Sequence, residues 1–230
     1  MTTAASQTNQ SPFDFWGLNF ADVFFPPTQP SHEAFSPQPT QDADVLRQLN
    51  FIPGLKEILT LRQVHALEHA TVWVLSGASS ATDPNTATNP VDNDSLGGVS
   101  TDQGFYLYGQ VNTADLRRAV HLALERIQQG EWNLAVHPRC GTNLSVGMLL
   151  TAGLSLGIHL ALPRGPIEQL LGIGLATTTA AQLAPDLGKL AQRYVTTAIP
   201  FNLAIEAVTL TQDLWGRPAH FVRVRWTESI

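Results

Sequence analysis

The sequence predicts a mainly α-helical protein with a small β element, an α+β fold whose apolar helical hairpin is embedded in a membrane. Three observations carry this prediction. Apolar residues recur at helical spacing over residues 55–72. Residues 144–162 contain no charged side chain over about the length of a membrane crossing, and a second apolar segment follows at 167–183. Two short segments, 104–109 and 220–226, have the composition of β-strands.

Composition sets further limits. The chain has 230 residues, enough for one or two domains with a real core. Only 14% of the residues are charged, against roughly 25% in soluble proteins, which indicates apolar surroundings. The net charge of −6 offers no basic patch to nucleic acid. Cys140 is the single cysteine, so no internal disulfide forms, and with Arg47 as the first basic residue no secretory signal peptide is expected.

Residues 1–41 are rich in Ser, Thr, Gln and Pro, which is typical of a disordered or loosely packed tail. Six aromatic residues gather between Phe13 and Phe25. They form either a strap that packs on the folded body or an interfacial membrane anchor, although this stretch lacks the Lys and Arg residues that such anchors carry. Residues 42–76 are expected to be helical, with an interruption at Pro53-Gly54.

A long acidic loop is predicted over 77–103, either solvated or acting as a lid over a site. A strand at 104–109 and a helix over 114–129 follow it, with Asn112 and Thr113 as the natural cap of that helix. Near the end of the chain, 201–212 is predicted to be an amphipathic helix. The last strand, at 220–226, is expected to pair with 104–109.

The apolar segments 144–162 and 167–183 are interpreted as two transmembrane helices joined by a turn. Gly153 and Gly157 would let such helices pack closely. A buried hairpin in a large soluble core is the alternative, and the threonines at 177–179 leave it open. The turn holds one basic residue, Arg164. The flanks hold six: Arg117, Arg118, Arg126, Arg139, Lys189 and Arg193. The positive-inside rule then puts both flanks in the cytoplasm.

The segment His65-Ala66-Leu67-Glu68-His69 contains the residues of a metal site. Positions i, i+3 and i+4 share one face of a helix, so both imidazoles and the carboxylate point the same way. Imidazole nitrogens suit zinc, and a carboxylate beside a metal-bound water can serve as its general base. The order H-x-x-E-H is the inverted zincin motif. The alternative is a pair of ordinary hydrogen-bonded histidines with a surface glutamate.

A second segment supplies a third ligand. His137-Pro138-Arg139-Cys140 brings another histidine and the thiol within four residues, and either side chain could complete a zinc site with His65 and His69. The chain is therefore divided into four regions: a tail at 1–41, a metal-site domain at 42–143, the hairpin at 144–183, and a C-terminal helix and strand at 184–230 that pack on the metal-site domain.

Three separated blocks carry a resemblance to a known family: His65-Ala-Leu-Glu-His-Ala-Thr71, Ala135-Val-His-Pro-Arg-Cys-Gly-Thr-Asn-Leu144, and Gly188-x-x-x-Gln192-x-x-x-Thr196-Thr197-x-x-Pro200 with Ile205-Glu206-Ala207 after it. Over about residues 60–210 the chain resembles the YqhQ-like family of bacterial membrane proteins, in particular a cyanobacterial branch known as a domain of unknown function. That family is described as metal-dependent, without an established reaction. The resemblance implies a metal site and a membrane setting, and no substrate.

We expect a metal-dependent hydrolase at the cytoplasmic membrane face, in one form a peptidase acting on a membrane protein or peptide. His65 and His69 bind zinc or a similar divalent transition metal, Glu68 activates water, and His137 or Cys140 completes the site. The alternative is a non-enzymatic assembly or interaction module, in which these residues form a closed structural site. Membrane lipid is the expected partner in both cases, and nucleic acid in neither.

Overall fold

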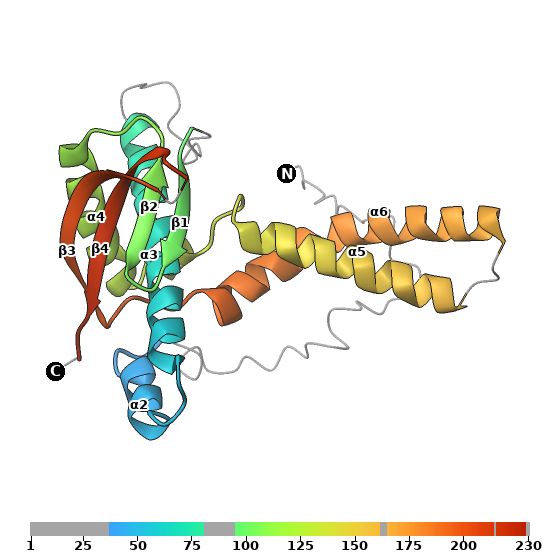
Figure 1. Cartoon of the computed structure of the whole chain (residues 1–230), viewed down its shortest axis with the longest axis horizontal. Helices are drawn as coiled ribbons and strands as arrows, with labels where there is room; N and C mark the ends of the chain where they lie inside the picture. Colours follow the sequence, from blue (N-terminus) through green and yellow to red (C-terminus); the bar gives the residue numbers. More distant parts are fainter. Residues whose placement is uncertain (1–36, 81–94, 162–164, 214, 229–230) are drawn as a thin grey trace, which may run out of the picture. The chain divides into compact units, whose positions relative to one another are not determined.

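Helices predominate in the structure, a computed structural model that describes residues 37–80, 95–161, 165–213 and 215–228 (Figure 1). All of these belong to one unit, which begins at Pro37. One small antiparallel sheet accompanies the helices, which confirms the predicted fold class. Nearly all of the predicted tail, with its aromatic residues, lies outside the described part of the chain.

Local sequence signals account for most of the helices outside the apolar hairpin. The described helices outside the hairpin are α2 (Gln41–Gln48), α3 (Leu55–Ser80), α4 (Thr113–Gln128) and the short 3₁₀ helix η2 (Trp132–Ala135). Gly54, whose φ of 81° favours glycine, separates α2 from α3. The side chain of Asn112 accepts a 2.8 Å hydrogen bond from the backbone N–H of Ala114 and so caps α4. The predicted interruption and the predicted cap are both confirmed.

Within the described residues the sheet holds four strands: β1 (Gly97–Thr101), β2 (Gly104–Tyr108), β3 (Leu203–Gln212) and β4 (Pro218–Trp226). Their order is β1-β2-β4-β3, and every neighbouring pair is antiparallel. Phe105 of β2 lies opposite Val222 of β4, so the predicted pairing of the last strand with 104–109 is confirmed. Figure 1 shows α3 and α4 behind this sheet.

The hydrophobic core fills the space between the sheet and these two helices. Phe105 and Val222 are completely buried, as are Leu67 of α3 and Val120 of α4. A fully buried side chain of this size contributes roughly 1.5–3 kcal/mol to stability, so the core holds α3 firmly against the sheet. The packing also fixes which side of α3 is left to form a site.

Two predictions about the secondary structure are wrong. The segment 201–212 is not a helix, because residues 203–212 form strand β3. A β-bulge between Ile205 and Ala207 breaks the strand's alternation, so its apolar residues imitate helical spacing. The predicted loop at 77–103 is too long, since α3 runs on to Ser80 and β1 occupies 97–101. The idea of a lid over the site concerns 81–94, outside the described residues.

The apolar hairpin consists of α5 (Gly141–Ala161) and α6 (Pro166–Ala191), and α6 continues into a turn of π-helix, η3 (Gln192–Thr196). Both helices were predicted, although α6 extends eight residues beyond its predicted end at 183. Small residues of α6 are buried in the contact between them, namely Gly172, Ala176, Ala180 and Gly188.

No residue of α5 is buried. Among the described helices, α5 alone is long and apolar enough to cross a membrane, so one of the two predicted crossings meets that test. The second helix, α6, carries Pro185, Asp186 and Lys189 in its last two turns. Arg164, on which the predicted orientation depends, lies outside the described residues. The membrane embedding of the hairpin remains a prediction.

Candidate metal centre

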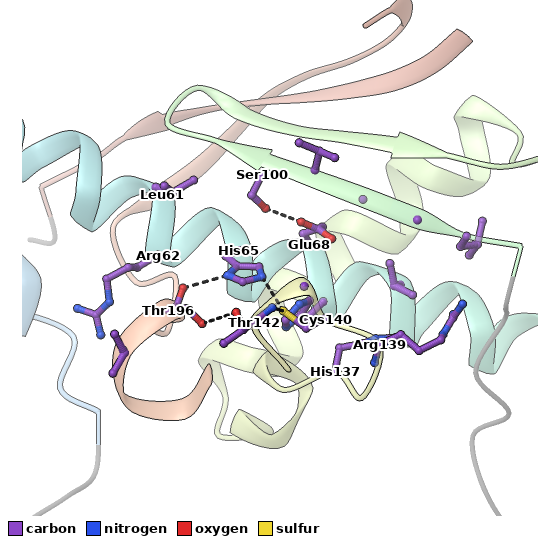
Figure 2. A pocket seen from close by; sticks show the side chains of 18 of the residues that line it. Leu61, Arg62, His65, Glu68, Ser100, His137, Arg139, Cys140, Thr142 and Thr196 are labelled. Carbon is purple, nitrogen blue, oxygen red and sulfur yellow. Dashed lines mark hydrogen bonds between the residues drawn. The ribbon is translucent and has the colours of Figure 1, made fainter. Parts of the chain in front are cut away.

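The predicted motif lies on one face of α3 and lines a cavity. His65, Glu68 and His69 all border this cavity, whose volume is about 750 Å³. Its other walls come from β1, from the segment 137–142 and from η3 (Figure 2). Residues far apart in the chain therefore meet around the helix face that the motif predicted.

Three of the predicted ligands come together in this cavity. One ligand atom each from His65, His69 and Cys140 lies within 4.8 Å of the others. The Cys140 Sγ is 3.2 Å from the His65 Nε2. Tetrahedral zinc, with bonds of about 2.0–2.3 Å, holds its donors roughly 3.3–3.8 Å apart. The three side chains could hold a metal ion with small adjustments.

Backbone carbonyls orient both imidazoles. The His65 Nδ1 is 3.0 Å from the carbonyl oxygen of Thr196, and the His69 Nδ1 is 2.7 Å from that of Ala135. A carbonyl oxygen only accepts, so each Nδ1 carries the hydrogen and donates it. The Nε2 of each ring is then the nitrogen left to bind a metal, and metal-binding histidines are held in this way. The orientation of both rings is therefore built into the fold.

The thiol of Cys140 is buried next to these rings. Burial raises its pKa, but hydrogen bonding and charge attraction from His69, together with hydrogen bonds from Thr142, outweigh burial and leave the pKa below its usual value. The backbone N–H of Thr142 lies 3.4 Å from the Cys140 Sγ. A thiolate is the form that binds metals, so these contacts favour the ligand form.

Glu68 occupies a separate position against β1. It accepts a 2.5 Å hydrogen bond from the Ser100 hydroxyl, and its carboxylate fills the space over Gly98, where a Cβ would lie 2.2 Å from Oε1. Burial raises the pKa of Glu68, while the Ser100 hydrogen bond and attraction to His65 oppose that rise. Glu68 is thus a buried carboxylate beside the three ligands, with a raised affinity for a proton.

His137 borders the cavity but is not one of the three grouped ligands. Its ring centroid is 5.6 Å from that of His69 and 4.8 Å from that of Trp73. Its Nδ1 accepts a hydrogen bond of 3.3 Å from the backbone N–H of Arg139. Of the two predicted third ligands, the geometry therefore favours Cys140.

Sequence reasoning assigned no role to the residues that support the site. Gln192, which is completely buried, accepts a hydrogen bond from the backbone N–H of His137 and donates one to the Asn143 side chain. Thr196, Gly98 and Ser100 hold His65 and Glu68 as described above. The sequence held two weak signals: Gln192 and Thr196 fall in the third block of the resemblance, and Gly97-Gly98 interrupts a polar stretch.

Comparisons with known proteins agree with the extent of the resemblance. Residues 60–208 match the model of a domain of unknown function, DUF6391. An uncharacterized protein of the cyanobacterium Picosynechococcus sp. is 52% identical over 195 residues, which cover 85% of this chain and 94% of that protein. No solved structure matches.

Both matches bear on the predicted resemblance. The cyanobacterial branch of unknown function is confirmed, whereas neither match supports the relation to the YqhQ-like proteins. The matched region runs from α3 to β3 and includes His65, Glu68, His69 and Cys140. The chain belongs to the DUF6391 family.

Proposed function

We propose that this protein is a metal-dependent hydrolase of the zinc type, associated with a membrane and with its site on the cytoplasmic face. The observation that carries the proposal is the convergence of the His65, His69 and Cys140 ligand atoms beside a separately held carboxylate, Glu68. Two nitrogens and one sulfur form a donor set that suits zinc.

The number of protein ligands favours a catalytic metal site over a structural one. Catalytic zinc sites have three protein ligands and an open fourth position, and a cation bound in this way lowers the pKa of a water molecule there to about 7. Glu68 would receive that proton, since its carboxylate has a raised pKa and is held by Ser100 outside the group of ligands. His65 and His69 would act as neutral ligands through Nε2.

A closed structural site in a non-enzymatic membrane module is the second candidate. The position of the His137 ring, 5.6 Å from that of His69, favours it, because a modest rotation could bring a fourth ligand into place. The cavity argues against it, since a closed site needs no space of about 750 Å³ beside the metal.

The membrane setting belongs to the same proposal. The exposed apolar surface of α5 supports it, and so does the excess of basic residues on both flanks of the hairpin. A distant relation to the metal-dependent YqhQ-like proteins is also part of the proposal, and rests on the three sequence blocks alone.

Metal content is the first test. The purified full chain should contain about one zinc-type ion per chain, and a variant with His65→Ala and His69→Ala should contain almost none. His121→Ala is the matched control, because His121 is an exposed histidine outside the cavity. Elemental analysis of the three proteins measures the result, and an unchanged metal content in the double variant would remove the proposal.

The Glu68→Gln variant distinguishes a catalytic metal site from a structural one. The substitution keeps the size of the side chain and its capacity to accept a hydrogen bond from Ser100, but it removes the proton acceptor. Metal content and melting temperature should stay near those of the wild type, while the protein's function in a complementation assay falls to the level of a deletion. Loss of a general base commonly costs a factor of about 10²–10⁴ in rate.

Two other outcomes would contradict the proposal that the protein is an enzyme. A Glu68→Gln protein that keeps its metal and still complements has no need of a base. One that loses its metal and its fold together identifies a structural site, since structural metal binding is folding energy.

A further inference from the structure

We propose that the outer edge of β1, which pairs with no other described strand, binds the substrate, and that the substrate is an extended polypeptide segment that pairs with β1 as a further strand. The proposal deepens the proposed function and rests on it for the chemistry. It names the substrate class, which the metal ligands alone leave open.

The position of β1 is the first argument. This strand stands at one edge of the sheet, with β2 as its neighbour among the described strands. Its consecutive residues Gly97, Gly98, Val99 and Ser100 all line the cavity that holds the metal ligands and Glu68. In an antiparallel pair, every second residue of an edge strand directs its N–H and C=O away from its neighbour. Such an edge is a template for another extended chain.

The opposite edge of the sheet shows what a protected edge looks like. Strand β3 carries a β-bulge between Ile205 and Ala207, and the charged Glu206 lies within it. Bulges and charges of this kind discourage pairing with a further strand. The five residues of β1 include no charged residue, no proline and no shift of register. Of the two edges, the one beside the metal ligands has none of these protective features.

Distance to the chemistry is the next argument. A strand added to β1 lies about 4.8 Å from it, and the β1 residues with which it would pair line the cavity. The Glu68 carboxylate lies against Gly98 and Ser100 of β1, and His65 is one helical turn away. An amide of the added strand would therefore come close to both Glu68 and the metal ligands.

The reaction balances with water as the co-reactant. The oxygen of water forms a bond to the amide carbonyl carbon, and the C–N bond breaks. Glu68 accepts one proton from the water and returns it to the leaving nitrogen, so that a carboxylic acid and an amine are released. The remaining water proton then passes from the acid to the amine, which leaves a carboxylate and an ammonium group.

Apolar side chains on the cavity wall indicate the kind of sequence that fits. Ile58, Leu61, Val99 and Val195 all line the cavity, and all four are exposed, Ile58 and Val195 to 57% and 65%. They would be covered by the apolar side chains of a bound segment. The volume is in the usual range for a binding pocket, roughly 300–1,000 Å³, and holds a few residues of a chain. The expected substrate is therefore an apolar-rich stretch of polypeptide.

Hydrolysis assays provide the first test. Capped ten-residue peptides with apolar central residues should be cleaved by the zinc-loaded full chain at least about tenfold faster than N-acetyl-leucine amide. N-methylation along the best peptide should lower kcat/KM at every second residue on the side that pairs with β1, and much less at the residues between. Hydrolysis of N-acetyl-leucine amide alone, or an N-methyl effect without alternation, would overturn the strand pairing and leave the hydrolase intact.

Hydrogen–deuterium exchange gives a readout that does not depend on turnover. The same peptides, added in excess to zinc-loaded Glu68→Gln protein, should slow exchange in residues 97–101, while residues 203–212 serve as the internal control. An absence of protection in β1, with or without peptide binding elsewhere, overturns the inference. Protection of β1 in a protein that hydrolyses neither peptide nor amide supports strand pairing and contradicts the hydrolase instead.

Discussion

Gln192 connects the two sides of the metal centre through its amide group. Its Oε1 accepts a 2.8 Å hydrogen bond from the backbone N–H of His137, and its Nε2 donates a 2.7 Å hydrogen bond to the Oδ1 of Asn143. These partners flank Cys140 in the chain, so one buried side chain fixes the segment that presents the thiol. Gln192 also begins η3, and π-helical turns are frequent at functional sites.

Gln192→Leu should therefore weaken metal binding without touching a ligand. The substitution leaves the buried N–H of His137 without its acceptor, at a cost of about 1–3 kcal/mol in stability. The loss of a group that orients ligands commonly lowers metal affinity about 10–100-fold. A competitive titration against a chromophoric chelator measures the zinc affinity. Gln128→Leu is the matched control, since that half-buried glutamine donates to the Pro200 carbonyl outside the site. Equal affinities in the two variants would contradict this role.

The part of the site that could be predicted from the sequence is the part that lies on a single helix. The spacing of His65, Glu68 and His69 on a single helix placed them on one face without any knowledge of the fold. Their supporting contacts are long-range: Thr196 is 131 residues from His65, and Ser100 is 32 from Glu68. No local pattern encodes such pairs, and the choice of Cys140 over His137 depends on them in the same way.

Secondary-structure elements were predicted where their signals were local. The cap at Asn112 marked the start of α4, whose predicted bounds were right to within a residue, and the strand predicted at 104–109 corresponds to β2. Strand β3 was missed because its bulge changes the phase of the alternation, and the partner that determines its register, β4, follows later in the chain. A strand's identity depends on pairing, which the order of residues within it does not reveal.

The contact between β1 and α3 offers a test with two adjacent glycines. A Cβ at Gly98 would lie 2.2 Å from the Glu68 Oε1, whereas a Cβ at Gly97 would meet nothing within 4 Å. Gly98→Ala should displace the carboxylate, lower stability by about 1–3 kcal/mol and reduce hydrolysis. Gly97→Ala should leave the stability near that of the wild type, and both proteins should keep their zinc. Denaturant unfolding and elemental analysis check the pair, and equal stability of the two variants would contradict the placement of Glu68.

The hairpin and the residues of the metal centre adjoin one another in the chain. Cys140 comes immediately before α5, and η3, whose Thr196 orients His65, follows α6 directly. The outer surface of the hairpin is strongly apolar: Leu149, Leu160 and Leu170 are each more than 70% exposed. A large exposed apolar surface marks an interaction site. An uncharged helix of 21 residues is long enough to cross a lipid bilayer. Insertion of the hairpin would place both ends of the site at the membrane surface.

A double substitution in α5 tests the membrane prediction. Leu149→Lys with Leu156→Lys places two charges on the exposed surface near the middle of the helix, where each costs about 2.5–3.5 kcal/mol of insertion free energy. The wild type should stay in the membrane pellet after an alkaline wash, and the double variant should be released. Leu122→Lys, on the exposed side of α4, is the control and should stay in the pellet. Release of the wild type would contradict the prediction outright. A double variant that stays in the pellet would show that something other than α5 holds the protein there.

The zinc content of the double variant should match that of the wild type, because neither substitution lies in the cavity. A loss of zinc on release from the membrane would mean that the lipid-bound hairpin is needed to assemble the centre.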